Sequence, residues 1–165
     1  GGTGLTNKGR QFVMRAQELG IMLDMSHISE RGFWDTLEIS TRPVIAGHSN
    51  SKAVCNVPRN LSDEQFLALV RQGGGAGINL YPKFLGLGRN IDAVFAHIEN
   101  FMSLGGEKSV FLGCDLDGIG EMPRGISGVQ DLGRIYETLL RHNYSEQLVC
   151  DIFRNNILKV MEKAL

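Results

Sequence analysis

A regular alternation of short apolar segments and longer amphipathic segments constrains the fold of this chain more than any other feature. Four short apolar segments occupy residues 21–25, 44–46, 76–81 and 109–113. Stretches with helical periodicity occupy residues 6–19, 29–42, 62–71, 91–104, 129–141 and 146–163. This order predicts a parallel α/β fold, because consecutive parallel strands need a crossover helix between them. Two architectures fit the pattern, a doubly wound sheet and part of a (β/α) barrel.

The length of the chain bears on the choice between these architectures. Its 165 residues match the usual size of a single domain. Four βα units make half of an eight-unit barrel, which typically needs about 250 residues. The chain also starts with a helical stretch rather than with a strand. We therefore expect residues 1–165 to form a single partial domain.

The composition narrows the classes of partner. The chain has 17 Lys and Arg against 18 Asp and Glu, so its net charge of −1 predicts no nucleic-acid partner. No apolar run approaches the roughly 18–20 residues of a membrane span. Three cysteines, Cys55, Cys114 and Cys150, are an odd number without Cys-x-x-Cys spacing. This pattern excludes a complete disulfide framework and a cysteine zinc knuckle, and it favours a reducing, cytoplasmic location.

Polar side chains follow each of the four apolar segments. The carboxyl ends of parallel strands meet on one rim, so these residues are expected to converge there. Neutral imidazole is a common zinc ligand, and a nearby carboxylate can move protons. A histidine after a strand is also often a solvated or capping residue, and both interpretations stay open at this point. The residues are His27, His48, Asn79 with Tyr81, and Asp115 with Asp117.

For three further basic residues, the sequence gives weaker evidence of a functional role. Arg59 follows Pro58 in a long predicted loop over residues 49–61. Its planar guanidinium could bind a carboxylate through two parallel hydrogen bonds, although an arginine in a loop is also a common surface charge. His97 stands inside a predicted helix and His142 at the end of another, so both are expected to be structural or exposed.

Five short motifs follow one another in a specific order and spacing. They are Asp24-Met25-Ser26-His27, Pro43-Val44-Ile45-Ala46-Gly47-His48-Ser49-Asn50, Pro58-Arg59-Asn60-Leu61, Gly77-Ile78-Asn79-Leu80-Tyr81 and Gly113-Cys114-Asp115-Leu116-Asp117-Gly118. The set resembles the membrane (renal) dipeptidase family over almost the whole chain. The resemblance implies an α/β fold that is the C-terminal half of a (β/α)8 TIM barrel of the amidohydrolase type. About four βα units plus C-terminal helices would make up this half.

The resemblance also implies a metal centre with hydrolytic chemistry. Complete enzymes of the family hold two zinc ions and hydrolyse dipeptides. By resemblance, His27 and His48 match the two histidines that bind one of these ions. Asp115 matches the aspartate that is expected to pass protons between the attacking water and the leaving amine.

The resemblance assigns a dipeptide substrate to the remaining site residues. Arg59 matches the arginine that pairs with the C-terminal carboxylate of the substrate. Tyr81 and Phe84 occupy the segment that walls the substrate pocket. Some family members have a tyrosine at the position of Phe84, and this chain lacks that hydroxyl group.

Several residues of the family site have no counterpart in this chain. They are a His-x-Asp pair, a glutamate that bridges both metals and a further histidine that contacts the substrate. The chain alone is therefore expected to be inactive, because two histidines leave zinc two ligands short of a tetrahedral set. Its open sheet edges are expected to pair with the missing N-terminal half of the barrel or with another copy of the chain.

Two other functions fit the same residues. One is a non-catalytic barrel relative that acts as a binding or assembly module. The other is an amidohydrolase acting on other amides, esters or lactams. The retained set of His27, His48, Arg59 and Asp115 argues against the first, because a site without function has no physical need for all four.

Overall fold

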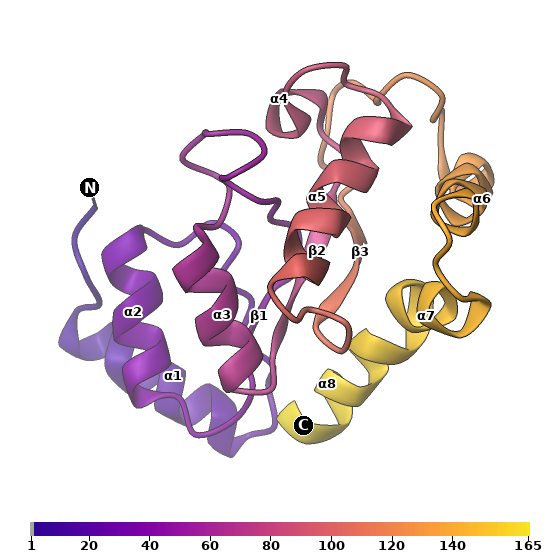
Figure 1. Ribbon diagram of the computed structural model, residues 1–165. Helices are drawn as coiled ribbons and strands as arrows, with labels where there is room; N and C mark the ends of the chain where they lie inside the picture. Colours follow the sequence, from indigo (N-terminus) through magenta and orange to yellow (C-terminus); the bar gives the residue numbers. More distant parts are fainter. Residues whose placement is uncertain (1) are drawn as a thin grey trace.

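Three parallel strands form the sheet at the centre of the molecule (Figure 1). The computed structural model describes residues 2–165. The strands β1 (Ile45–Ala46), β2 (Gly75–Asn79) and β3 (Val110–Cys114) follow one another in the sheet in chain order. A parallel sheet with a helix in each crossover is what the alternating sequence predicts, so a mixed α/β fold is confirmed.

The apolar segment at residues 21–25, predicted as a strand, is not one. It makes a single parallel bridge, from Asp24 to Ile45. Two backbone hydrogen bonds support the bridge, from Met25 N to Ile45 O at 2.8 Å and from Ile45 N to Leu23 O at 3.0 Å. The ladder ends there because the Asp24 carboxylate accepts the next backbone donors, Ser26 N and Gly47 N. The segment nevertheless lies beside β1 in the parallel sense.

The helices largely follow the predicted ranges. Side-chain caps define several of their starts, at Thr6, Ser29 and Ser62, and the capping box between Ser62 and Gln65 is formed as predicted. A Gly-rich loop over residues 115–128 follows β3. The helices before this Gly-rich loop are α1 (Asn7–Glu18), α2 (Glu30–Ile39), α3 (Asp63–Arg71), α4 (Pro82–Leu85) and α5 (Ile91–Ser103). Those after it are η1 (Val129–Asp131), α6 (Gly133–Arg141), α7 (Glu146–Cys150), η2 (Asp151–Asn155) and α8 (Asn156–Ala164).

Two segments differ from their predictions. The predicted loop at residues 82–90 contains the short helix α4, which starts with Pro82 at a position where a missing N–H costs nothing. The predicted continuous helix at 146–163 is interrupted by η2, one π-helical segment between α7 and α8.

Helices cover one face of the sheet, and α8 contacts part of the other face. In Figure 1, α3 and α5 lie in front of it, and their Phe66 and Phe101 rings stack with centroids 4.1 Å apart. A second, smaller apolar cluster joins Ile45 and Phe111 of the sheet to Val160 of α8. Between these layers the sheet is buried at its centre, since all five residues of β2 are buried.

The sheet curves strongly around β2. A Cβ atom added at Gly113 of β3 would collide with the carbonyl oxygen of Gly47, which follows β1, and would lie 3.1 Å from Gly77 Cα. In a flat sheet two strands separated by a third lie about 9–10 Å apart. Glycine at these positions therefore allows backbone contact between strands that are not neighbours in the sheet.

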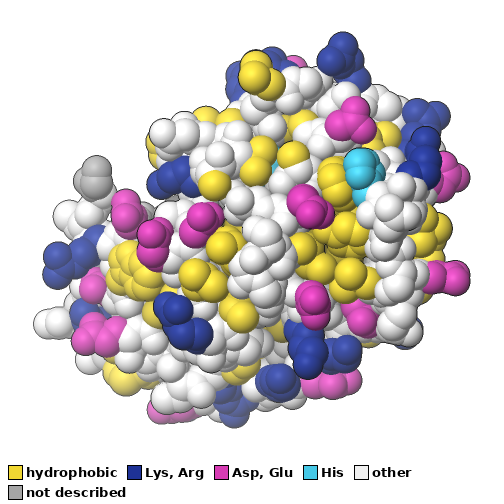
Figure 2. Space-filling view, in the orientation of Figure 1, with side chains coloured by type: hydrophobic (Ala, Val, Ile, Leu, Met, Phe, Trp, Pro, Cys, Tyr) yellow, Lys and Arg dark blue, Asp and Glu magenta, His cyan; other side chains and the backbone are white. Residues whose placement is uncertain are grey.

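The outer surface is of mixed charge. On the face shown in Figure 2, basic and acidic side chains are interspersed rather than gathered by sign. Among the helices of residues 2–165, none has the length and apolar composition needed to cross a bilayer. Each of the three cysteines is a free thiol.

His97 of α5 is fully buried and hydrogen-bonded, so it is structural, one of the two roles expected for it. Its Nδ1 accepts from Ser51 N at 3.1 Å, and its Nε2 lies 3.3 Å from Leu85 O. Because Nδ1 accepts, Nε2 is the nitrogen that donates. Burial lowers the pKa of His97 to about 4, while the carbonyl groups of Leu85 and Phe84 oppose the shift.

This buried imidazole should make the fold sensitive to acid. The unfolded chain takes up the His97 proton near its ordinary pKa of 6.5, whereas the folded chain does so only near 4. The free energy of unfolding should therefore fall between these pH values, by about 3 kcal/mol in total. Urea unfolding of the chain and of His97→Gln, at about pH 7 and about pH 4.5, measures this loss. The variant should lose less stability on acidification, whereas His142→Gln, on the surface, should behave like the parent. Equal losses of unfolding free energy in the parent and in both variants would contradict the claim that His97 causes the acid sensitivity.

Candidate functional site

His27 and His48 meet at the carboxyl edge of the sheet. His27 follows the segment that bridges to β1, and His48 follows β1 itself. Their Nε2 atoms lie 2.9 Å apart, and their ring centroids lie 4.9 Å apart. Two imidazole nitrogens bound to one tetrahedral zinc at 2.0–2.1 Å lie roughly 3.3 Å apart. The observed separation is that of a hydrogen bond and is slightly shorter than this value, so the two imidazoles fit one zinc ion as two of its donors after a small opening of the pair.

The described residues do not complete a metal site around this pair. No group of three or more His, Cys, Asp or Glu side chains within residues 2–165 is placed to hold a metal ion. Burial raises the pKa of the Cys114 thiol, which directly precedes Asp115 in the sequence. The two histidines thus account for half of a tetrahedral ligand set.

Arg59 lies against the histidine pair. Its Nη1 donates to the carbonyl oxygen of Ser26, and its Nη2 lies 3.4 Å from His27 Nε2. The guanidinium group also lies over the ring of Phe84, 5.5 Å from its centroid. Tyr81 packs edge-on against Phe84, with centroids 5.0 Å apart. The structure thus brings Arg59, Phe84 and Tyr81 together on one side of the histidines.

Asp115 follows β3 and is held by a residue at the end of β2. Asn79 Nδ2 donates to Asp115 Oδ2 at 3.1 Å, while Asn79 Oδ1 accepts from Tyr81 N at 2.6 Å. The register between the strands shifts at this point, because Ile78 pairs with Leu112 but Asn79 pairs with Cys114. This irregularity directs Asp115 toward Asn79. Asp115 also has a left-handed backbone, with φ +63°, which aspartate tolerates better than most residues.

The charges of these residues act on one another. The pKa of His27 lies below its ordinary value, mainly because of partial burial and then because of the Arg59 cation and His48. Asp115 and Asp24 oppose the shift. These effects favour the neutral imidazole of His27, which is the form that binds metal ions.

A cavity of about 680 Å³ opens beside this group. His27, Arg59, Lys52 and Glu30 are among the residues that line it. This volume lies within the range of small-molecule binding sites. Direct access to His27 and Arg59 from this cavity would allow a ligand to contact both.

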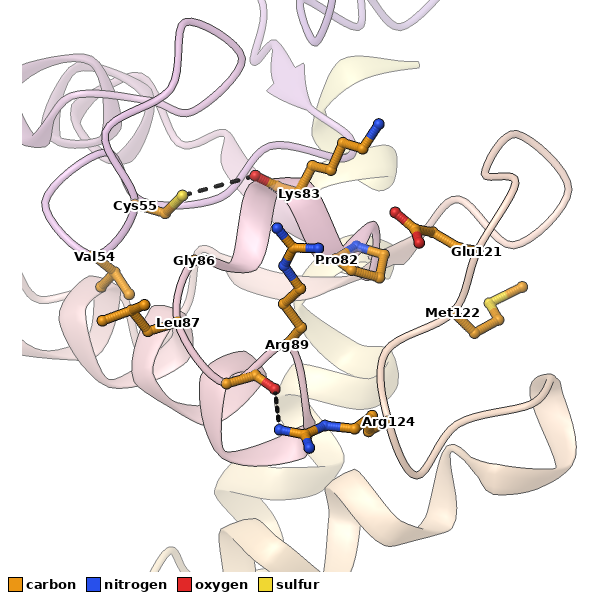
Figure 3. Close-up of a pocket in the computed structure, with 11 residues that line it drawn as sticks. Val54, Cys55, Pro82, Lys83, Gly86, Leu87, Arg89, Glu121, Met122 and Arg124 are labelled. Atoms are coloured by element: carbon orange, nitrogen blue, oxygen red, sulfur yellow. Dashed lines mark hydrogen bonds between the residues drawn. The ribbon is translucent and has the colours of Figure 1, made fainter.

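A second cavity of about 630 Å³ lies between the segment 82–89, which includes α4, and the loop that bears Glu121 and Arg124 (Figure 3). Lys83, Arg89 and Arg124 contribute three cations to its wall, and Glu121 contributes one carboxylate. Arg124 Nη2 donates to Gly88 O at 2.8 Å and so ties the Gly-rich loop to the segment after α4. None of the predicted site residues lines this cavity.

Sequence reasoning assigned no role to Asp24, although the structure places it against the site. Its Oδ2 lies 3.8 Å from His48 Nδ1. The signal in the sequence was a carboxylate inside the apolar stretch 21–25, directly before a polar strand end. Asn79 was noted at a strand end, but its contact with Asp115 depends on the irregular register and has no counterpart in sequence spacing.

The fold and the site together define a parallel α/β protein with a histidine-lined site at the carboxyl edge of its sheet. The family model described as membrane dipeptidase (peptidase family M19) matches residues 1–165. The chain therefore belongs to this family, and the resemblance seen in the sequence motifs is confirmed. This membership agrees with a metal-dependent site, since M19 enzymes are described as metallopeptidases.

Relatives of known structure superimpose closely on this chain. A metallopeptidase from Rhodobacter sphaeroides, with a bound phosphinate mimic of the dipeptide L-Ala-D-Ala, is 34% identical with a TM-score of 0.94. A dipeptidase of family M19 is 33% identical, also with a TM-score of 0.94. Each match covers 99% of this chain, but only 48% and 50% of the respective relatives.

A curated relative is also similar to nearly the whole of this chain. Dipeptidase 3 of Macaca fascicularis is 31% identical over 164 residues, which is 98% of this chain and 34% of that protein. The chain therefore spans about half the length of these solved relatives and about a third of the mammalian one.

Proposed function

We propose that this chain forms half of the active site of a zinc-dependent dipeptidase. The observation that supports the proposal most is the convergence of His27 and His48, with Nε2 atoms 2.9 Å apart. Arg59 and the Asn79–Asp115 pair flank the histidines, so a cation, a carboxylate and two metal donors share one edge of the sheet. Residues outside this chain, or a second copy of it, would supply the remaining ligands.

The curvature of the sheet supports the proposal that residues 1–165 are one partial domain, half of a (β/α)8 barrel. Contact between Gly113 and the Gly47 carbonyl across Gly77 is the curvature that closing a barrel requires. The outer edges of this half barrel, at residues 23–25 and at β3, would pair with the strands of the other half. Barrel closure of this kind leaves no sheet edge exposed.

The site residues of this chain would have distinct roles in hydrolysis. Zinc bound at His27 and His48 would supply a Lewis acid for the peptide carbonyl and lower the pKa of the attacking water. Asp115, oriented by Asn79, would accept the proton of that water and transfer it to the leaving amine. The hydrogen bond from Asn79 leaves Asp115 Oδ1 as the oxygen available for the proton.

Arg59 would limit the length of the substrate. A guanidinium group binds a terminal carboxylate through two hydrogen bonds, so the substrate must end where Arg59 lies. The guanidinium group of Arg59 lies over the Phe84 ring, and Tyr81 packs edge-on against Phe84. Both aromatic rings therefore help to hold the guanidinium group in place. The dipeptide mimic bound by the Rhodobacter relative is consistent with a dipeptide substrate.

The test is a substrate comparison in the full-length protein that contains this chain. The zinc-loaded protein should hydrolyse L-Ala-L-Ala and L-Ala-D-Ala, with about two zinc ions per chain by elemental analysis, and the chelated protein should not. Esters and lactams hydrolysed in preference to dipeptides would favour another amidohydrolase activity. A protein that binds no metal and hydrolyses none of these substrates would favour a binding module.

A separate experiment tests whether Arg59 limits the length of the substrate. Arg59→Gln should raise KM for L-Ala-L-Ala by about 10- to 100-fold, because it removes a charge-assisted carboxylate contact. The C-terminal amide of the same dipeptide lacks the carboxylate, so its KM should change little. Arg141→Gln, on the exposed side of α6, is the matched control and should leave both values unchanged. Equal effects of Arg59→Gln on the acid and the amide would contradict this role.

A further inference from the structure

We propose that Asp24 is a positioning residue that holds His48 in the orientation and protonation form needed to bind a metal ion. The inference rests on the proposed metal role of His48. Asp24 belongs to the segment that bridges to β1 and follows no predicted catalytic pattern. Its carboxylate nevertheless contacts both of the loops that bear the histidines.

The first carboxylate oxygen is held by three donors. Asp24 Oδ1 accepts from Ser26 N at 2.9 Å, from Ser26 Oγ at 2.5 Å and from Gly47 N at 2.9 Å. Ser26 Oγ in turn accepts from His48 N at 3.0 Å. A Cβ atom at Gly47 would collide with Asp24 Oδ2, so glycine lets the carboxylate approach the backbone. These contacts fix the carboxylate in place.

The second oxygen is thereby directed at one particular nitrogen of His48. Asp24 Oδ2 lies 3.8 Å from His48 Nδ1, whereas His48 Nε2 faces His27 on the opposite side of the ring. A carboxylate at Nδ1 favours the tautomer with the proton on Nδ1. The Nε2 lone pair then faces His27, on the side where a metal ion would bind both histidines. Asp24 acts through His48 and is not itself a metal ligand.

Substitution by asparagine gives a sharp test. In Asp24→Asn, the amide oxygen can still accept from the three donors, which places the amide NH2 group toward His48 Nδ1. That group donates, so it favours the tautomer with the proton on Nε2, which blocks the metal-binding lone pair. Asp24→Ala removes both effects and leaves the tautomer unconstrained. A positioning role therefore predicts weaker metal binding in Asp24→Asn than in Asp24→Ala, although the asparagine variant should be the more stable.

The experiment measures zinc affinity by competition with a chromophoric chelator and unfolding by urea, in the full-length protein. Asp24→Asn should weaken zinc binding by about 10- to 100-fold. Asp92→Asn, on the first turn of α5, is the matched control and should bind zinc as the parent does. In metal-free protein at a pH where histidine is neutral, ¹⁵N NMR of the imidazoles should show His48 with its proton on Nδ1. The proton should move to Nε2 in Asp24→Asn, and His48→Gln assigns the signals.

Two results would overturn the proposal. One is an unchanged His48 tautomer in Asp24→Asn. The other is zinc affinity that falls only in proportion to stability, with Asp24→Ala the weaker binder, which would make Asp24 a purely structural residue. If the parent protein binds no zinc, the proposed function fails instead. The His48 tautomer then decides the role of Asp24 independently.

Discussion

Replacing Asp115 with asparagine should lower kcat for dipeptide hydrolysis by about 10²- to 10⁴-fold in the zinc-loaded, full-length protein, with little change in KM. Asparagine has nearly the same shape and also tolerates the left-handed backbone at this position. It can still bond with Asn79 after a rotation of the amide. What it cannot do is accept a proton from water, so the loss should appear in the chemical step.

Steady-state kinetics with L-Ala-L-Ala, together with zinc content, measure this effect. Glu121→Gln removes a carboxylate from the same Gly-rich loop and should leave kcat unchanged, because Glu121 lines the other cavity. A kcat within a few-fold of the parent in Asp115→Asn would show that another group moves the proton. Loss of zinc in this variant would instead assign Asp115 to metal binding.

Replacing Gly113 with alanine should destabilise the fold by about 3 kcal/mol or more. The new Cβ atom would collide with the Gly47 carbonyl oxygen and approach Gly77 Cα to 3.1 Å. Both partners are backbone atoms, so no side-chain rotation can relieve the contact. Such a loss is a large part of the total stability of a domain, and the variant is expected to unfold or to flatten its sheet.

Urea unfolding of the parent and of Gly113→Ala measures this loss of unfolding free energy. Gly120→Ala is the matched control, because a Cβ atom there meets nothing within 4 Å and the backbone angle φ is not in the left-handed region. It should be within about 0.5 kcal/mol of the parent. If Gly113→Ala were as stable as the parent, the sheet would not be curved as described, and the half-barrel proposal would lose its main support.

The sequence alone predicted the parts of this protein that depend on local interactions. Helix starts at Thr6, Ser29 and Ser62 follow from side chains that bond to backbone groups three residues away, so spacing is enough to find them. The strand ends at His48 and Asp115 follow from short apolar segments with a polar residue after each. The rule that parallel strands end on one rim then predicts that these residues converge.

Other features depend on contacts between residues far apart in the chain. The segment at 21–25 is apolar enough for a strand, but Asp24 bonds to Gly47 N instead of leaving it to a ladder. Asp115 meets Asn79 through an irregular register between β2 and β3, and local spacing does not encode register. In the same way, the helical pattern at 146–163 contains no signal for the π-helical segment within it.

Local propensity and periodicity thus determined which segments are helical and which residues end the strands, because these depend on neighbours within one turn or one strand. Only the tertiary structure decided how the sheet curves, which carboxylate faces His48 and which residue holds Asp115. Those outcomes depend on steric and hydrogen-bond partners 20 or more residues away, such as Asp24 with Gly47 and Asn79 with Asp115. The identity of each partner is set by packing, which a single sequence does not display.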